Sequence, residues 1–219
     1  MFVADRMITN PVTIAPDTTV NTAKELMKEH NFRRLPVVEN EKLMGWVTEN
    51  DLRQVAPSSA TTLSVYEVNY LLAKLKIRDV MRKELIVARE DAPIEDAALL
   101  MLRHKIGGMP VVNSEEKLVG VITETDLFKA FLDMSGVSSG TMTRFTLKAE
   151  DKVGLLEALG GLFARQGMSI SSISCYTHER GEAQIVLRVE GEHEKAQAAI
   201  PDIERLGIQI VAVHHLSGE

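Results

Sequence analysis

The sequence predicts a mixed α/β protein of the α+β kind, with a duplicated first part and a ferredoxin-like βαββαβ domain after it. Three observations predict this. The stretch from Arg33, RRLPVVENEKLMGWVTENDL, is nearly repeated from Gly107 as GGMPVVNSEEKLVGVITETDL. Amphipathic helical patterns alternate with β-rich runs along the chain. After the Ser/Gly-rich stretch 135–140, their order becomes strand, helix, strand, strand, helix, strand.

The two copies of the repeat extend well beyond this stretch. Asp5 and Met7 align with Asp79 and Met81, and Gly45 aligns with Gly120. Each copy reads strand, helix, strand, strand, helix. The first comprises an extended run at 12–14, a helix opened by PDTT, a hairpin of LPVV and LMGWVT, and the short helix ENDLRQVA. One copy is too small to bury both faces of its sheet, so the two should pack together.

The repeat also predicts the domain boundaries. We expect the first unit at 1–62, and a connecting helix with the second unit at 63–134. The connecting helix begins with the capping motif Ser64-x-x-Glu67. Residues 135–140 are a linker, and the last domain covers 141–219.

Composition and charge limit the function classes. Of the 219 residues, 45% are hydrophobic and 26% are charged, and the formal net charge is −6. Nucleic acid and anionic membranes attract clustered positive charge, so we expect neither as a partner. No apolar run approaches the roughly 18 residues that span a bilayer, and the N-terminus lacks the apolar core of a signal peptide. We expect a cytoplasmic protein.

The residue types of enzyme and metal sites do not assemble in this sequence. Cys175 is the one cysteine, which excludes an internal disulfide and fits a reducing compartment. It lies in a β-rich run, where we expect a small buried side chain. No Cys/His cluster has zinc spacing, and no nucleophile–base set is present. We therefore expect no catalytic residue, no metal site and no required cofactor.

The duplicated part resembles the CBS domain, whose paired copies form the Bateman module. The resemblance rests on LPVV, MPVV, Gly45-x-x-Thr48-x-x-Asp51 and Gly120-x-x-Thr123-x-x-Asp126. It implies a sensor that binds an adenosine-containing ligand, such as AMP, ADP, ATP or S-adenosylmethionine, in clefts between the copies. The nucleotide-binding residues that it implies are Thr13, Arg33, Pro36, Thr48, Asp51, Pro110, Thr123 and Asp126.

Both Thr-x-x-Asp motifs have an ordinary structural explanation beside the functional one. Each stands where a strand enters a helix, and Thr at the N-cap with an acidic residue three positions later is a common helix cap. The same aspartate can accept hydrogen bonds from both ribose hydroxyls. The two roles are compatible. A phosphate would meet different residues in the two copies, since Arg33 stands where the second copy has Gly107. We therefore expect the Asp51 cleft to be the stronger phosphate site.

The last domain resembles the ACT domain, on Asp151-x-x-Gly154-Leu155-Leu156 and Gly167-Met168-Ser169-Ile170. ACT domains commonly dimerise and bind amino acids at the shared edge, and a helix N-terminus could receive the carboxylate. Two departures weaken a ligand site: Val153 replaces the usual proline, and Ser169 replaces asparagine. An ACT domain that only dimerises is an equal alternative. The ligand candidates are Asp151, Val153, Gly154, Leu155 and Ser169.

Tandem CBS units followed by an ACT domain resemble the accessory proteins of acetoin utilisation. The resemblance implies a regulatory protein that is not an enzyme. We expect a homodimer or a dimer of dimers that senses AMP, ADP or ATP and acts on an unidentified protein partner. The alternative is an oligomerisation scaffold with vestigial ligand sites.

Overall fold

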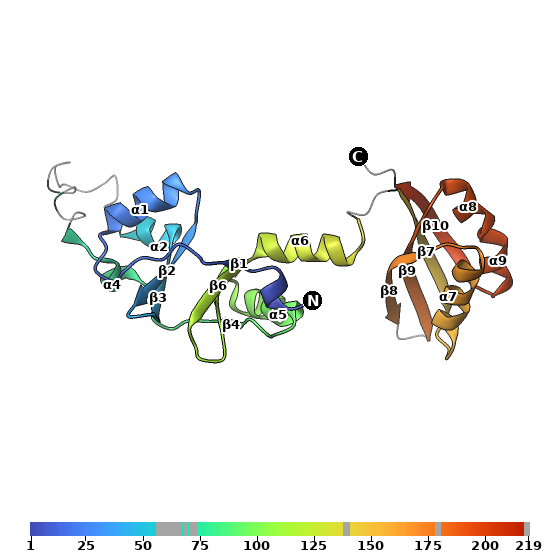
Figure 1. The fold of residues 1–219 in the computed structure, drawn as a ribbon, viewed down its shortest axis with the longest axis horizontal. Coiled ribbons are helices and arrows are strands. Elements are labelled where there is room, and N and C mark those ends of the chain that lie inside the picture. The colour runs from blue at the N-terminus through green and yellow to red at the C-terminus, as the bar shows by residue number, and fades with distance from the viewer. Residues whose placement is uncertain (56–66, 68–69, 71–73, 138–140, 178–180, 217–219) are drawn as a thin grey trace. The chain divides into compact units, whose positions relative to one another are not determined.

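The computed structural model describes the chain except residues 56–66, 68–69, 71–73, 138–140, 178–180 and 217–219 (Figure 1). The described residues divide into two compact units, Met1–Phe128 and Lys129–Glu219. Most of the predicted connecting helix, including Ser64 of its capping motif, lies outside the described residues; Glu67, Tyr70 and Lys74 are described and are helical. The domain boundaries expected from the repeat stay a prediction.

The first repeat forms the helix, hairpin and helix that its sequence predicts. The first helix begins after Thr19, whose hydroxyl accepts a hydrogen bond from the N–H of Thr22. The extended run expected at 12–14 is reduced to one parallel bridge between Ile14 and Val37. The elements are α1 (Val20–Glu29), β2 (Arg34–Glu39), β3 (Lys42–Thr48) and α2 (Glu49–Gln54).

The second repeat follows the same order. β4 pairs in parallel with β5, and β5 forms an antiparallel hairpin with β6. The hairpin leads directly into α6, as the first leads into α2. The elements are α4 (Ile77–Val80), β4 (Ala88–Arg89), α5 (Ile94–His104), β5 (Gly108–Val112), β6 (Leu118–Thr123) and α6 (Glu124–Met134).

The opening segment of each repeat pairs with the other repeat. After the short 3-10 helix η1 (Val3–Asp5), β1 (Ile8–Thr9) lies antiparallel to β6, with Ile8 opposite Val121. At the equivalent place in the second repeat, Arg82 forms an antiparallel bridge with Trp46. The backbone N–H groups of these two residues donate to each other's carbonyls at 2.9 and 3.0 Å. The predicted packing of the two copies is confirmed as an exchange of segments.

Methionine and glycine recur in both copies because the methionine of each copy packs against the glycine of the other. Met7 of the first copy packs over Gly120 of the second, and Met81 of the second packs over Gly45 of the first. A Cβ at Gly120 would lie 2.6 Å from Sδ of Met7, and one at Gly45 would overlap the side chain of Met81. Only glycine leaves room for the methionine at these positions.

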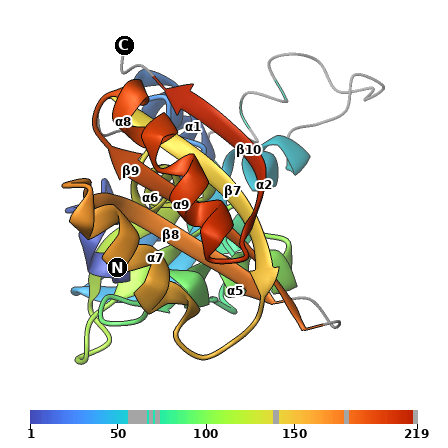
Figure 2. The same ribbon diagram turned by 90° about the vertical axis from the view of Figure 1, so that its right-hand side faces the viewer.

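The second unit is a four-stranded antiparallel sheet of order β10-β7-β9-β8, which is the ferredoxin-like order. Figure 2 shows its three helices on one face of the sheet. The core between them includes Phe145, Leu147, Phe163, Ile185 and Leu187. The elements are β7 (Met142–Glu150), α7 (Leu155–Arg165), β8 (Ile170–Thr177), β9 (Glu182–Glu190), α8 (His193–Ala198), α9 (Ile200–Arg205) and β10 (Gln209–Leu216).

One expectation about this unit was wrong. Cys175 is exposed, because β8 is an edge strand whose second half faces solvent on both sides. A β-rich run predicts a strand and not its place in the sheet. The helical pattern around Pro201 behaves as the sequence indicates, since α8 ends at Ala198 and α9 begins at Ile200 with the proline in its first turn.

Candidate functional site

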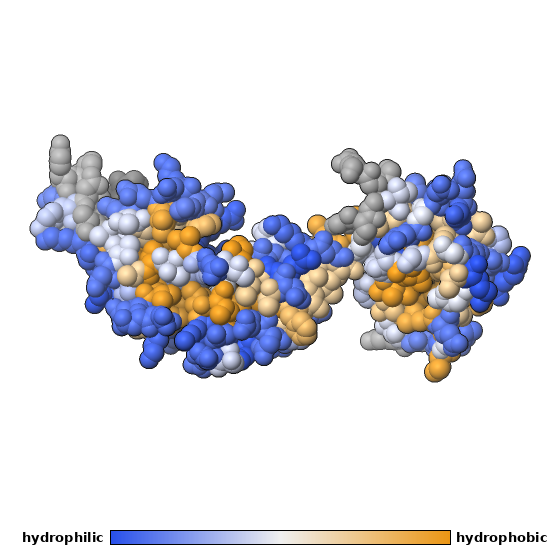
Figure 3. Space-filling model, viewed as in Figure 1, coloured by the Kyte–Doolittle hydropathy of each residue, from blue (hydrophilic) through white to orange (hydrophobic). Residues whose placement is uncertain are grey.

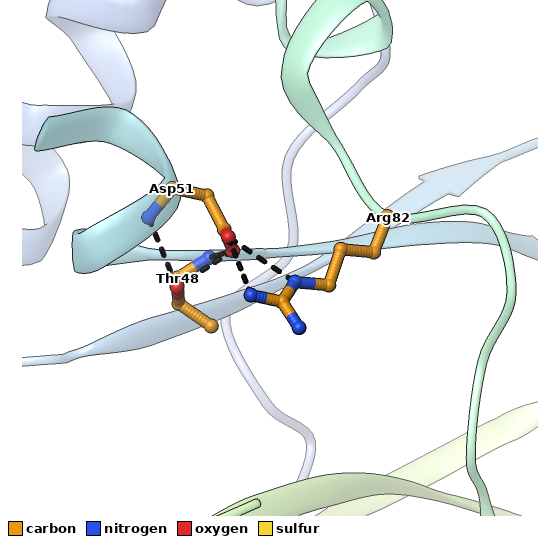
Figure 4. A network of polar contacts seen from close by, with 3 residues as sticks. All are labelled: Thr48, Asp51 and Arg82. Atoms are coloured by element: carbon orange, nitrogen blue, oxygen red, sulfur yellow. Dashed lines mark hydrogen bonds and ion pairs between the residues drawn. The ribbon is translucent and has the colours of Figure 1, made fainter. Parts of the chain in front are cut away.

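Asp51 caps the helix that follows the first hairpin. The backbone N–H and the hydroxyl of Thr48 donate to Oδ2 of Asp51 at 2.9 and 2.6 Å (Figure 4). The N–H of Asp51 donates in return to Oγ1 of Thr48 at 3.1 Å. This is the reciprocal capping box that the motif predicts. It fixes a largely buried carboxylate at the point where β3 becomes α2.

The other oxygen of Asp51 is held by an arginine of the second repeat. Arg82 donates from Nε and Nη2 to Oδ1 of Asp51, at 3.1 and 2.8 Å (Figure 4). Burial acts to raise the pKa of Asp51, but hydrogen bonds from Arg82 and Thr48 outweigh it and lower that pKa below its ordinary value. The pKa of Arg82 is raised, first by its hydrogen bond to Asp51 and then by the charge. The carboxylate is therefore ionised at neutral pH, and both of its oxygens accept hydrogen bonds.

Asp126 has the same cap without the arginine. The N–H and hydroxyl of Thr123 donate to Oδ2 of Asp126 at 2.9 and 2.6 Å. Ile8 stands where the second repeat has Arg82, in the equivalent backbone pairing with Val121. Within the described part of the chain, Oδ1 of Asp126 has no hydrogen-bond partner. The two aspartates thus differ in whether Oδ1 accepts hydrogen bonds from an arginine.

A cavity of about 360 Å³ lies beside each motif. We call the one beside Thr48 the Asp51 cleft. It is lined by Arg33, Arg34, Trp46, Thr48, Glu49, Asn50, Arg53, Arg82, Glu84, Leu85, Ile86, Lys105, Ile106, Gly107, Gly108 and Pro110.

The second cavity is the Asp126 cleft. It lies at the equivalent position in the second repeat, and residues of both repeats line each of the two clefts. Its lining comprises Ile8, Asn10, Pro11, Val12, Asn31, Phe32, Arg33, Arg34, Pro36, Gly107, Val121, Thr123, Glu124 and Thr125.

The charges of the two clefts are unequal. Five basic and two acidic side chains line the Asp51 cleft, whereas two basic and one acidic side chain line the Asp126 cleft. The sequence suggested Arg33 as the source of the difference, yet Arg33 and Arg34 line both clefts. The added positive charge of the Asp51 cleft comes from Arg53, Arg82 and Lys105.

Gly107 does more than omit an arginine. A Cβ there would overlap the guanidinium of Arg34 and lie 2.8 Å from Oε2 of Glu124. The first repeat's arginine therefore occupies the space that the second repeat leaves open. Burial lowers the pKa of Arg34, neighbouring Arg33 lowers it further, and Glu124 acts to raise it.

Five of the eight residues expected to bind nucleotide line the clefts, whereas Asp51 and Asp126 are nearly buried and are not among the lining residues. Thr48 and Pro110 line the Asp51 cleft, while Thr123 and Pro36 line the Asp126 cleft, so each proline serves the cleft of the other repeat's motif. Thr13 is placed apart from them, in a shallow depression with Glu41 and Lys117. Their roles in binding stay a prediction.

Arg82 was missed by reasoning from the sequence. The repeat alignment held the only signal, because Arg82 aligns with Ile8, a pair of opposite chemical character. Its approach to Asp51 depends on the exchange of segments, which no local pattern predicts.

The ACT ligand candidates are not brought together within one chain. Asp151 N–H donates to the carbonyl of Gly181 at one end of β9, while the carbonyl of Ser169 accepts from Glu190 N–H at the other end. β9 has nine residues, so its ends lie eight residue steps, or about 27 Å, apart. Val153 is fully exposed, and Gly154 adopts a positive φ of 90° as the N-cap of α7, which begins at Leu155.

These features define a paired-repeat module with two clefts, joined to a ferredoxin-like domain. The CBS domain family matches residues 3–58 and 77–133, which is just over half of the chain, and the ACT domain family matches residues 143–207. The chain therefore belongs to the CBS domain family, as a tandem CBS pair with a C-terminal ACT domain. No helix among the described residues is both long and apolar enough to cross a membrane.

Similar proteins cover mainly the CBS pair. The uncharacterized protein MJ1225 of Methanocaldococcus jannaschii is 35% identical over 128 residues, which make up 56% of this chain and 46% of that protein. This chain thus spans about half of its relative's length.

Two solved structures are also similar. CBSX2 in complex with AMP is 31% identical, with a TM-score of 0.51 over 60% of this chain and 96% of that one. The Vibrio cholerae protein named AcuB, for acetoin utilization, is 30% identical, with a TM-score of 0.53 over 63% and 94% of the two chains.

Proposed function

We propose that this protein is a cytoplasmic regulatory sensor that binds an adenine nucleotide of the AMP, ADP or ATP class in its CBS clefts. The observation that carries the proposal is the Asp51 cleft, which five basic side chains line and where one of them, Arg82, binds the capped carboxylate of Asp51. A carboxylate suits ribose hydroxyls, and guanidinium groups suit phosphate. The AMP complex of the similar protein CBSX2 supports the same ligand class.

The proposed output is a change in a protein partner and not a chemical reaction. The likeness to AcuB supports a partner in acetoin or related carbon metabolism. We propose that the chain self-associates as a homodimer or a dimer of dimers, because α5 and α6 expose large apolar side chains: Leu99, Leu102, Phe128, Phe131 and Leu132.

Calorimetry with AMP, ATP and adenosine tests the binding proposal. Arg33→Ala should weaken AMP and ATP about tenfold or more and adenosine little, because a charge-assisted bond to phosphate contributes about 1.5–3 kcal/mol. Asp51→Ala should weaken all three, since the ribose contact is common to them. Unchanged AMP and ATP binding in Arg33→Ala would refute the role of Arg33 in phosphate binding, and loss of all binding in Asp126→Ala alone would refute the Asp51 cleft as the stronger site. A wild-type protein that binds none of the three ligands would refute the proposal itself.

For the ACT domain we propose at most weak binding of free amino acids. The candidate residues lie at opposite ends of the sheet in one chain, and Val153 and Ser169 depart from the pattern of amino-acid binders. A thermal-shift screen of the twenty amino acids should give no ligand with a Kd below roughly 10 µM, which corresponds to about −7 kcal/mol. One tighter ligand would contradict this proposal.

A further inference from the structure

Arg82 occupies the carboxylate oxygen that a ribose would need. Oδ2 of Asp51 is committed to Thr48 in the helix cap, which leaves Oδ1 as the oxygen for a ligand. Arg82 holds Oδ1 through two N–H groups, at 3.1 and 2.8 Å. A nucleoside that binds Asp51 through its hydroxyls must first displace this guanidinium.

The rest of Arg82 is placed so that its head group can turn away. Its backbone is fixed to Trp46 by two hydrogen bonds, whereas its side chain is 58% exposed and lines the Asp51 cleft. The guanidinium can therefore leave Asp51 without any change in the backbone. Arginine offers planar N–H pairs that match phosphate as well as carboxylate.

We infer that Arg82 sets the ligand specificity of the Asp51 cleft, by exchanging Asp51 for a ligand phosphate; this rests on the proposed function. A neutral nucleoside displaces Arg82 from its carboxylate partner into a cleft where five basic side chains face only two acidic ones. A phosphorylated nucleoside supplies the replacement anion. The cleft therefore discriminates against adenosine and favours AMP.

The Asp126 cleft lacks this device. Ile8 stands in place of Arg82, and Oδ1 of Asp126 has no hydrogen-bond partner in the described part of the chain. A ribose that approaches Oδ1 of Asp126 therefore has no cation to displace. The two clefts therefore differ in selectivity for phosphate as well as in charge.

Titration of Trp46 fluorescence tests the inference at one cleft. Trp46 is the only tryptophan and lines the Asp51 cleft. AMP and adenosine are each titrated into the full chain as wild type, Arg82→Ala and Arg82→Gln. We expect both variants to bind adenosine more tightly and AMP more weakly, so that the AMP-to-adenosine affinity ratio falls about tenfold or more.

Arg78→Ala is the matched control. It removes the same charge from the same segment, but Arg78 pairs with Asp17 and does not line the cleft, so the ratio should stay at its wild-type value. A wild-type ratio in both Arg82 variants, or an equal weakening of both ligands, would overturn the inference while leaving the proposed function intact. Failure of AMP to bind the wild type would overturn both. The thermal unfolding midpoint of each variant shows that it is folded.

Discussion

At the scale of single residues, the pair of Asp51 and Arg82 couples the first unit's stability to pH. The pKa of Asp51 is lowered in the folded protein, so its ionised form stabilises the fold above the unfolded carboxyl pKa of about 4. This contribution is lost as the pH falls through the lower, folded pKa. In Arg82→Gln the part of this stabilisation that Arg82 contributes is absent, so the free energy of unfolding at pH 7 should be lower than in the wild type. The difference in the free energy of unfolding between wild type and variant, measured with urea at pH 7, should narrow below about pH 4.

Arg78→Gln is the control for this experiment, because Arg78 and Asp17 are both exposed and such pairs contribute little. The free energy of unfolding of Arg78→Gln should differ little from that of the wild type at every pH. A gap between wild type and Arg82→Gln that widens on acidification would contradict the assignment of the pair.

The contacts within a helix cap could be predicted from the sequence. The contacts that form when the opening segment of one repeat pairs with the other repeat could not. Thr48 and Asp51 are three positions apart, so their contact follows from helix geometry alone. The contact of Asp51 with Arg82 joins residues 31 positions apart and needs the tertiary fold. The same holds for Arg34, which reaches the space over Gly107.

At the scale of elements, the exchanged segments depend on the absence of a side chain at Gly45 and Gly120. Gly45→Ala should lower the free energy of unfolding of the first unit by roughly 1–3 kcal/mol, because the new Cβ overlaps Met81 and lies 3.1 Å from the carbonyl of Arg82. Chemical denaturation followed by Trp46 fluorescence measures this. Adding Met81→Ala to Gly45→Ala should recover part of the loss.

Gly160→Ala is the control, because a Cβ there would meet no heavy atom within 4 Å beyond its chain neighbours and the backbone of its own helix, and α7 favours alanine. It should raise the stability of the second unit by roughly 1 kcal/mol or less. An effect of Gly45→Ala no larger than that of a surface substitution would refute the role of the methionine and glycine pairs.

Most elements could be predicted because their patterns are local. α1, α7 and the two hairpins have clear periodicity and caps or turns. The position of each strand within its sheet could not be predicted from such local patterns. The exposure of Cys175 depends on β8 being the edge of its sheet, and β1 joins a sheet of the other repeat.

At the scale of the whole molecule, apolar side chains remain exposed on α5 and α6. Leu102 is 76% exposed and Phe131 is 64% exposed, and Figure 3 shows apolar surface along α6 beside hydrophilic side chains. We expect light scattering at micromolar concentration to give a multiple of the 24.2 kDa chain mass. Leu102→Glu with Phe131→Glu should lower that mass, because a charge is costly in an apolar interface.

Met44→Glu places one such glutamate at an exposed position of β3 and should leave the mass unchanged. A monomeric wild-type protein would contradict the self-association and would also remove support for the scaffold alternative.

The emission of Trp46 during titration with AMP tests the central claim most directly. The residue is 6% exposed, lines the Asp51 cleft and gives all of the tryptophan signal of the chain. Binding at this cleft predicts a saturable change in emission in the wild type that Asp51→Ala weakens strongly. An emission that does not respond to AMP, or an equal response in Asp51→Ala, would contradict the account.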